Sequence, residues 1–243
     1  MLIFEPMNQF KEPLFRCSSL DNLMSGATAP GETCISTIRE LAYLNKYGIR
    51  KRFSNKYTDK GIQNEPMSLE IAARVLGWYE FDKNAVKERR NDDFLTGETD
   101  FESELRIADV KSSFDHLSFP DHSKVIKSVP AYEWQMRGYM RIYQREQISL
   151  VYVLTPIPEQ MIQDQIRREI WQAMANPAYS GMSMEEIESK VEEDFRNEVD
   201  FDVIPEEKRV REFILKRDAV KEHQLITRLT LCRAIYKEIF NQI

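Results

Sequence analysis

The sequence predicts an α/β fold, in which an α/β core carries helical additions at both ends. The first observation is the order of its runs: helical patterns come first, three strand-like runs follow, and one more strand stands between helices. The second is the apolar, β-branched run ISLVYVLTPIP at residues 148–158, which is typical of a buried strand. The third is the amphipathic spacing of the helical runs, two of which end at a glycine.

Helices are expected through the first part of the chain. Residues 17–24 start a short helix that a serine caps, and residues 36–48 have helical spacing with a terminal glycine. A polar, basic connector follows. Residues 64–77 form an amphipathic helix in which Pro66 occupies the first turn.

Three strand-like runs come next, at residues 78–83, 93–102 and 105–112. Ser103 and Glu104 separate the last two runs, so we expect a hairpin with a tight turn there. Aromatic residues at strand spacing in this region are expected in the core: Tyr79, Phe81, Phe94 and Phe101.

The rest of the chain reads as helix around one strand. Residues 131–144 form a helix before the strand at 148–158. Helices are then expected at 159–175, near 183–197 and near 206–241, where the long run has room for a break. A chain of 243 residues suits one large domain, or one and a half, and can bury a proper core.

The net charge of −6 argues against a nucleic-acid binder when it is taken alone. Net charge is a sum, however, and binding responds to the local field. Much of the acid lies at residues 185–194. The middle of the chain is richer in basic residues: 49–53, 87–90, Arg137, Arg141 and Arg145.

The cysteine content and the apolar runs of the chain limit its expected compartment and its expected cofactors. Its three cysteines, Cys17, Cys34 and Cys232, are scattered and show no CxxC spacing. This pattern indicates a reducing cytoplasm and argues against a disulfide framework, a zinc site or an iron–sulfur site. We read no signal peptide, and no apolar run approaches the roughly 20 residues of a membrane span.

Two carboxylates and one ammonium stand in the predicted hairpin. Asp109 and Lys111 are two residues apart on a strand, so they project from the same face. Asp100 lies on the preceding strand and can approach Asp109 across the ladder. Two such carboxylates repel each other unless a cation neutralises them, and Mg²⁺ prefers oxygen ligands of this kind. The set is suited to metal-assisted phosphodiester hydrolysis.

The acid-x-Lys pattern is weak evidence by itself, because the chain contains it three times. The copies ending at Lys190 and Lys208 fall in predicted solvated helices, where they read as surface charge. The copy ending at Lys111 is in an apolar strand with another acid upstream. The alternative for that copy is an edge strand with a salt-bridged Asp–Lys pair.

Two further features accompany the hairpin. Glu65 opens the predicted helix at 64–77, where an acid is also favoured by the helix dipole alone. Gln135 and Tyr139 stand four residues apart on one helical face. The alternative for this second pair is an amphipathic helix with Tyr139 in the core.

Taken in order, these residues resemble the motifs of the PD-(D/E)XK nuclease superfamily, and more closely those of lambda-exonuclease (YqaJ-like) phage recombination exonucleases. The resemblance implies a restriction-endonuclease-like core, a central mixed β-sheet flanked by helices, in a single nuclease domain (1–243). The motif-bearing core is about residues 15–158, and a helical C-terminal extension is about 159–243. The motif residues are Glu65 in G-x-x-x-E, Asp100, Asp109-Val110-Lys111 and Gln135-x-x-x-Tyr139.

The resemblance also implies residue roles. The metal ligands are Asp100, Asp109, the Val110 carbonyl and Glu65. The catalytic residues are Lys111, which positions or activates the attacking water, together with Glu65 and Gln135. The substrate-binding residues are Ser19, Arg16, Gln135, Tyr139 and Arg137. Departures from the family pattern are Thr99 in the place of the proline that names the motif, and the short Asp109. A further family aspartate corresponds to Asp92 or Asp93, unless these two form a turn.

The implied function is a Mg²⁺-dependent exonuclease that degrades linear double-stranded DNA from its ends, 5′ to 3′, leaving 3′ single-stranded tails for recombination. Two ions are expected, and Mn²⁺ can substitute. By family analogy we expect a homo-oligomer, a trimeric ring around DNA, a single-strand-annealing partner and, if the chain is phage-encoded, the bacterial host cytoplasm. The alternatives are a PD-(D/E)XK endonuclease of repair or restriction, and a non-catalytic binding or assembly module on the same fold.

Overall fold

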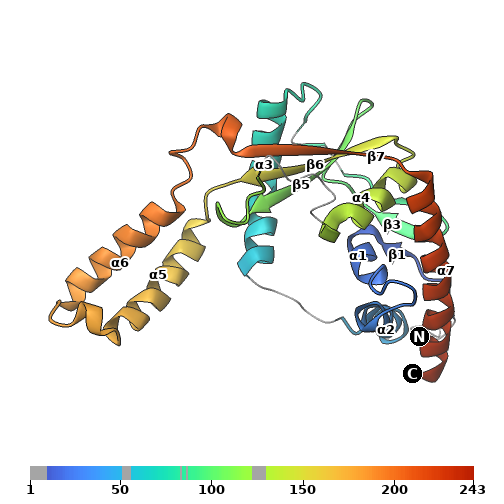
Figure 1. Ribbon diagram of the computed structural model, residues 1–243, viewed down its shortest axis with the longest axis horizontal. Helices are drawn as coiled ribbons and strands as arrows, with labels where there is room; N and C mark the ends of the chain where they lie inside the picture. Colours follow the sequence, from blue (N-terminus) through green and yellow to red (C-terminus); the bar gives the residue numbers. More distant parts are fainter. Residues whose placement is uncertain (1–9, 51–55, 83, 86, 122–129) are drawn as a thin grey trace, which may run out of the picture.

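The computed structural model describes residues 10–50, 56–82, 84–85, 87–121 and 130–243, with two β-sheets and the helices around them (Figure 1). The strands are β1 (Phe15–Arg16), β2 (Arg90–Asn91), β3 (Leu95–Gly97), β4 (Phe101–Glu102), β5 (Ile107–Ser113), β6 (Gln147–Leu154) and β7 (Val210–Lys216). The α-helices are α1 (Leu20–Leu23), α2 (Glu32–Tyr47), α3 (Lys56–Leu76), α4 (Pro130–Ile142), α5 (Glu159–Met174), α6 (Met184–Val199) and α7 (Ala219–Gln242). Short 3₁₀ turns are η1 (Cys17–Ser19), η3 (Pro177–Tyr179) and η4 (Glu206–Lys208).

The larger sheet is mixed and has the strand order β4-β5-β6-β7. The two central strands, β5 and β6, run parallel, and β4 and β7 are antiparallel to their neighbours. Helix α3 packs on one face through residues such as Leu69 and Ala72, whereas α4 packs on the other through Met136 and Met140. This is the mixed sheet flanked by helices that the sequence predicts.

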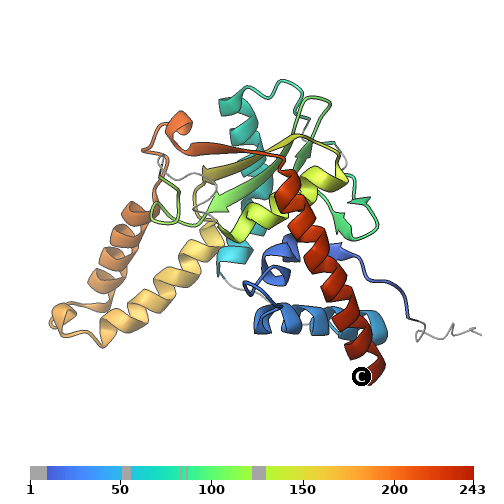
Figure 2. The same ribbon diagram turned by 45° about the vertical axis from the view of Figure 1, so that its right-hand side comes forward.

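The smaller sheet, β1-β3-β2, joins the N-terminal segment to the strands before the hairpin. The C-terminal helix α7 then packs beside α2, so chain segments far apart in sequence lie side by side (Figure 2). Lys46 Nζ donates to the carbonyl of Phe240 at 2.8 Å, and Cys34 Sγ lies 3.6 Å from Cys232 Sγ. These contacts fix the N-terminal helices on the core.

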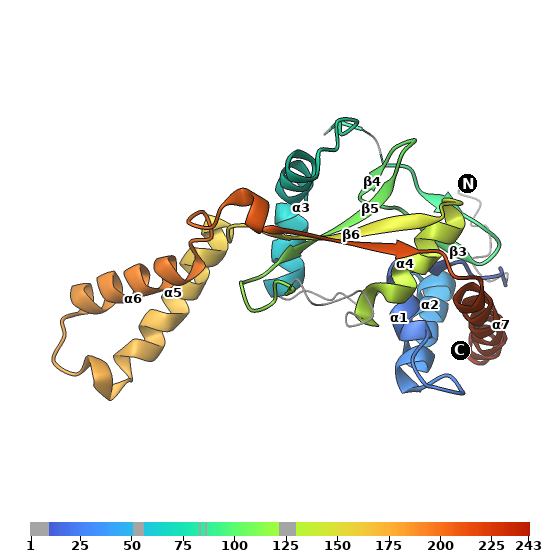
Figure 3. The same ribbon diagram turned by 45° about the horizontal axis from the view of Figure 1, so that its top comes forward.

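Helices α5 and α6 form a hairpin that projects away from the larger sheet (Figure 3). It has its own apolar cluster, in which Ile162 and Ile166 of α5 pack with Ile187 and Val191 of α6. A capping box begins α6: Ser183 Oγ accepts from the Glu186 N–H, and the Glu186 carboxylate accepts from the Ser183 N–H. The two predicted helices in this region are confirmed.

Two strand predictions before β5 are wrong. Residues 78–82 leave α3 through Gly77, which has a φ of 66°, and then turn, and residue 83 of the predicted strand lies outside the described residues. Trp78 stacks on Phe101 with ring centroids 5.0 Å apart, whereas the Tyr79 side chain is exposed instead of lying in the core. Residues 93–102 also do not form one strand, because the chain passes from the smaller sheet to the larger one between β3 and β4. The predicted hairpin is confirmed, and its turn spans residues 103–106, where the Ser103 N–H donates to the Arg106 carbonyl at 2.8 Å.

Two predicted helices have different bounds or a different structure. Helix α3 begins at Lys56, so Pro66 lies inside the helix and not in its first turn. Part of the long helix predicted near 206–241, and hence of the extension predicted to be helical, is strand β7, which pairs with β6 over Val210–Lys216. Charged residues on its exposed side hide the strand pattern, and such charges protect an edge strand from pairing with other chains.

Across the described residues, no helix combines the length and apolar character that a membrane span requires.

Candidate active site

Asp109 and Lys111 project from the same face of β5, as their two-residue spacing predicts. Lys111 Nζ lies 2.6 Å from Asp109 Oδ2, and the Asp109 side chain is 2% exposed. Their face of the strand is covered by α4, where the ring centre of Tyr132 lies 5.0 Å from Lys111 Nζ. A buried carboxylate is costly unless a cation accompanies it, so Lys111 stabilises the charge of Asp109.

Asp100 lies beside this pair at the open end of β4. Strand β4 pairs Phe101 with Ala108, which places Asp100 almost opposite Asp109. Asp100 Oδ2 accepts a hydrogen bond of 2.7 Å from the Val110 N–H. The N–H and C=O of one strand residue point to the same side, so the Val110 carbonyl faces the same edge as the Asp100 carboxylate. Three oxygen donors of the predicted metal set therefore lie together.

The electrostatics of the three side chains suit a cation. Burial raises the pKa of Asp100 to about 7, and the negative charge of Asp109 adds to the rise. Burial acts to lower the pKa of Lys111, but the charges of Asp109 and Asp100 outweigh burial and raise it. Lys111 is thus an ammonium at neutral pH, and the two carboxylates repel each other. A hard divalent ion among their oxygens would relieve that repulsion.

Gln135 and Tyr139 of α4 reach this cluster from above the strand. Gln135 Nε2 donates to Asp109 Oδ1 at 3.2 Å and to the Tyr139 hydroxyl at 3.1 Å. The same helix also packs closely against η1 and α1, because Gly138 has no side chain: a Cβ there would lie 2.5 Å from Leu20 Cδ1. The structure therefore brings the predicted pair to the carboxylates.

Glu65 approaches from α3, which covers the other face of β5. It lines a cavity of about 470 Å³ together with Asp100, Val110 and Lys111. A lysine that sequence reasoning did not assign to the site, Lys87, contacts Glu65 Oε1 and places its Nζ 3.6 Å from Asp100 Oδ1. Glu65 therefore shares the cavity with Asp100 and Val110, whereas the buried Asp109 is not among its lining residues. The ammonium of Lys87 stands between Glu65 and Asp100.

A small basic cavity of about 180 Å³ adjoins the site through Tyr139. Arg16 lines it, as do Ser18, Arg89 and Thr96, whereas the predicted Ser19 is not among its lining residues. Burial, followed by the positive charges of Arg50 and Arg89, lowers the pKa of Arg16. The guanidinium groups of Arg16 and Arg89 thus line one small space together with a single carboxylate, that of Glu98. Two cationic groups against one anionic group suit an anion.

Two other predicted positions are engaged elsewhere. Arg137 pairs with Glu133 at 2.7 Å and its side chain is only 9% exposed, so it offers little surface to a phosphate. Asp92 accepts from the N–H groups of Phe94 and Leu95, at 2.8 and 2.7 Å, and pairs with Arg141. The Asp92–Asp93 pair therefore forms a turn, which the sequence left as an alternative.

The donor set fits a hard metal ion in part. Within the described ranges, no group of three or more His, Cys, Asp and Glu side chains is gathered for a metal. The two carboxylates and the Val110 carbonyl supply oxygen donors of the kind that Mg²⁺ prefers, and water and phosphate usually complete its shell. Glu65 would join them only if Lys87 moved aside.

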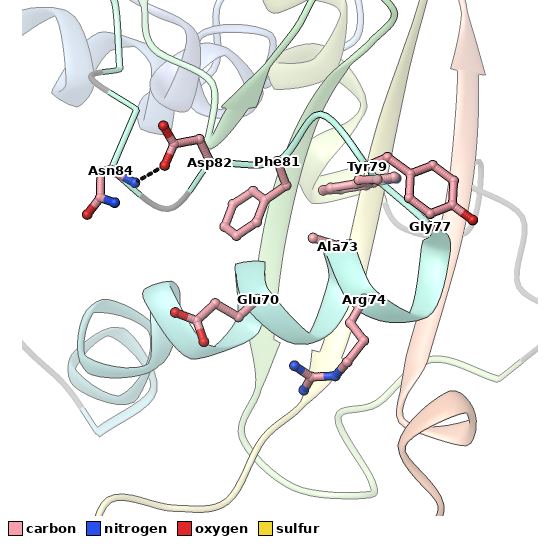
Figure 4. Close-up of a pocket in the computed structure, with 9 residues that line it drawn as sticks. Glu70, Ala73, Arg74, Gly77, Tyr79, Phe81, Asp82 and Asn84 are labelled. Carbon is pink, nitrogen blue, oxygen red and sulfur yellow. Dashed lines mark hydrogen bonds between the residues drawn. The ribbon is translucent and has the colours of Figure 1, made fainter.

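A larger cavity, of about 670 Å³, lies at the far end of α3 (Figure 4). Glu70, Arg74 and the exposed Tyr79 line it, and Arg74 pairs with Glu206. It does not contain the carboxylate pair or Lys111, so its size alone does not make it the active site.

Solved structures with similar folds now give the arrangement a context. The chain is similar to a phage-related exonuclease from Haemophilus somnus 129PT, with a TM-score of 0.64 and 24% identity over 97% of both chains. It is also similar to an alkaline exonuclease from Laribacter hongkongensis, with a TM-score of 0.55 and 12% identity over 94% of this chain and 90% of that one. This chain has the exonuclease fold. The structure of the Laribacter enzyme in complex with dAMP gives a TM-score of 0.53 and 12% identity, covering 93% and 89% of the two chains.

The exonuclease fold is thus shared over nearly the whole chain, including the C-terminal part that carries no recognised motif. No protein-family model and no curated protein sequence matches the chain. The fold that the resemblance predicts is confirmed.

Sequence reasoning gave no individual role to three residues near the site, Ser18, Arg89 and Lys87, and counted the last two only among the basic residues of the run 87–90. Arg89 and Lys87 belong to the run 87–90, which is visible as a basic cluster in the sequence. The run and Glu65 are not on one helix or strand, so no helical or strand repeat predicts that they lie close together. Ser18 and Ser19 are adjacent, and only the turn η1 decides which one faces the cavity. These three positions depend on loop paths that local pattern does not fix.

Proposed function

We propose that this chain is a metal-dependent exonuclease that hydrolyses phosphodiester bonds at the ends of linear double-stranded DNA, 5′ to 3′, and leaves 3′ single-stranded tails. The observation that carries the proposal is the buried Asp109, paired with the half-buried Lys111 and lying beside Asp100, on an exonuclease fold. A structural salt bridge needs no second buried carboxylate next to it, because that carboxylate adds repulsion.

Mg²⁺ is the proposed cofactor, with Mn²⁺ able to substitute and two ions in the complete site. Asp100, Asp109 and the Val110 carbonyl would hold one ion, and Glu65 would contribute to the other. When bound, such an ion lowers the pKa of its water and neutralises charge that develops on phosphate. The chain supplies the fixed oxygen donors and a partly open cavity lined by Asp100, Val110 and Lys111.

Lys111 and Gln135 act on the reacting groups in this proposal. The ammonium of Lys111 donates hydrogen bonds, so it orients the attacking water and offsets the negative charge of the phosphate. The Gln135 amide is fixed by Asp109 and Tyr139 and lies beside the terminal nucleotide. Because this amide is neutral, it would position the substrate without adding charge to the site.

The small basic cavity is the proposed place for the 5′-terminal phosphate. Guanidinium and hydroxyl donors line it, from Arg16, Arg89 and Ser18. Tyr139 also lines this cavity and accepts a hydrogen bond from Gln135, which in turn donates to Asp109, so the cavity adjoins the metal site. The alkaline exonuclease of the same fold has been solved with dAMP, a nucleoside monophosphate, which supports nucleotide binding by this fold.

We also propose a homo-oligomeric ring, a trimer by family analogy, with a single-strand-annealing protein as partner in a bacterial host cytoplasm. A ring keeps an enzyme on a duplex without a strongly positive surface. That consideration matters for a chain of net charge −6.

The deciding experiment is digestion of 5′-end-labelled linear duplex DNA with Mg²⁺. We expect release of mononucleotides and a loss of about 100-fold or more in rate for Lys111→Ala, because the positioned ammonium is removed. The matched control is Lys190→Ala, which changes an exposed lysine of another acid-x-Lys tripeptide and should leave the rate unchanged.

Covalently closed circular duplex separates the proposal from the endonuclease alternative. An exonuclease leaves the circle intact, whereas nicking or linearisation of the circle that is lost in Lys111→Ala would indicate an endonuclease. Equal digestion of linear DNA by wild type and Lys111→Ala would refute the proposed site.

A further inference from the structure

The Lys87 side chain occupies the gap between two predicted metal ligands. It comes from the segment before β2, far in sequence from both, and its side chain is 32% exposed. Its ammonium contacts Glu65 Oε1 and lies 3.6 Å from Asp100 Oδ1. The second oxygen of Asp100 is already used by the Val110 N–H. Lys87 therefore faces the Asp100 oxygen that is left for another cation.

Two cavities meet at this place. One, of about 410 Å³, is lined by Lys87 and Arg90, and the other, of about 470 Å³, is lined by Lys111. Glu65 and Asp100 line both. Asp100 thus stands between two ammonium groups: that of Lys111, which pairs with Asp109, and that of Lys87, which pairs with Glu65.

An ammonium and a divalent ion cannot both use these oxygens. Mg²⁺ binds oxygen at about 2.0–2.1 Å, inside the space that the Lys87 Nζ fills beside Glu65. Like charges a few ångströms apart also repel strongly in a partly buried site. Burial acts to lower the pKa of Lys87, but the hydrogen bond that Lys87 donates to Glu65 and the charges of Asp100, Glu65 and Glu98 outweigh burial and raise the pKa. Lys87 is thus charged at neutral pH.

We propose that Lys87 is a tethered counter-cation of the metal site: it holds Glu65 and Asp100 together in the metal-free protein and must leave before divalent ions can bind these two carboxylates. This inference rests on the proposed function. Lys87 is a positioning residue that sets the affinity for the divalent ion, and it competes with that ion.

The sign of the effect distinguishes competition from a structural role. A structural residue weakens metal binding when it is removed, whereas a competitor strengthens it. Titration calorimetry with Mn²⁺, without DNA at pH 8, should therefore show about tenfold tighter binding in Lys87→Met than in wild type, because a competing charge is gone. Lys87→Arg, which keeps the charge, should stay within about twofold of wild type.

The matched control is Arg90→Met. Arg90 lines the same cavity and pairs with Glu102 at 2.8 Å, outside the Glu65–Asp100 gap. Its loss removes an equal charge without opening the gap, so Mn²⁺ affinity should change by less than about twofold. Equal tightening in Arg90→Met and Lys87→Met would mean that only general charge matters, and would overturn the inference.

A measurement on wild type guards against a variant that does not fold. Limited acetylation followed by mass spectrometry should show that Lys87 reacts several-fold faster with Mg²⁺ present, while Lys190 on α6 reacts at an unchanged rate. Unchanged acetylation of Lys87, or unchanged or weaker Mn²⁺ binding in a folded Lys87→Met, would overturn the inference. If wild type binds no Mn²⁺, the proposed metal-dependent function fails instead.

Discussion

Asp100 is the residue whose negative charge most clearly lowers the stability of the metal-free protein. Burial and the nearby charge of Asp109 raise its pKa to about 7, above the usual value of about 4. A carboxyl with a raised folded-state pKa stabilises the fold less as pH rises, because the unfolded chain loses its proton first. The loss of stability that the Asp100 charge causes begins above about pH 4 and is complete above about pH 7.

Asp100→Asn should therefore stabilise the metal-free protein while it lowers DNA cleavage. Asparagine keeps an oxygen acceptor for the Val110 N–H but removes the charge. In EDTA we expect the melting temperature to rise by about 2–5 °C at pH 8 and by much less at pH 5. Thermal melts across pH check this. A lower melting temperature for Asp100→Asn at pH 8 contradicts the account, and Glu104→Gln, at an exposed turn position, is the control.

Residues close in sequence were the easiest part of the site to predict. Asp109 and Lys111 share a face because a strand alternates, and Gln135 and Tyr139 share a face because four residues make about one helical turn. Lys87 could not be predicted in this way, since its contact with Glu65 depends on the path of the segment between α3 and β2. The alternative of a plain Asp–Lys edge pair is weakened by the second buried carboxylate, Asp100.

At the scale of elements, the position of α4 controls the site. Helix α4 places Gln135 on Asp109, and it packs onto the turn before α1 through Gly138. A Cβ at Gly138 would lie 2.5 Å from Leu20 Cδ1 and 3.0 Å from Cys17 Sγ. The helix cannot accept a larger residue there without moving.

Gly138→Ala should destabilise the protein by about 1–3 kcal/mol, the typical cost of overpacking, and should also lower cleavage. Gly61→Ala is the matched control within α3, because a Cβ there meets no atom within 4 Å. That change should stabilise by about 0.5–1 kcal/mol, because alanine favours helix over glycine. Denaturant unfolding of both variants checks the pair, and a Gly138→Ala protein as stable as wild type would show that α4 is not held there.

Strand β7 shows where element prediction fails. Its exposed side includes Glu212 and Lys216, which read as the polar face of a helix. Pairing with β6 decides its structure, and that partner lies more than 50 residues earlier in the chain. The helices α5 and α6 were predictable because their apolar stripes pack mainly on each other.

At the scale of the whole molecule, the negative charge is concentrated in the helical hairpin. Residues 159–199 contain 10 acidic and 4 basic residues, a net charge of −6, which equals the net charge of the entire chain. The remaining residues are therefore neutral in sum. The hairpin projects away from the sheet that carries the site (Figure 3). The acidic pI therefore says little about the surface near Asp100 and Lys111.

Neutralising part of the hairpin should leave catalysis nearly unchanged. The triple variant Glu185→Gln, Glu188→Gln, Glu193→Gln removes three exposed charges from α6. At 0.15 M salt the screening length is about 8 Å, so kcat/KM on linear duplex should stay within about twofold of wild type. Steady-state kinetics at low and physiological salt check this. A tenfold change at 0.15 M would place the hairpin against the DNA and contradict this arrangement.

The most direct test of the central claim is the position of bound divalent ions. Anomalous diffraction from crystals soaked in Mn²⁺ should show a peak contacted by Asp100, Asp109 and the Val110 carbonyl, with Glu65 turned toward the site and Lys87 displaced from it. The same soak of Asp109→Asn should lose that peak. Mn²⁺ peaks only at other surfaces, with Lys87 still between Glu65 and Asp100, would contradict the account.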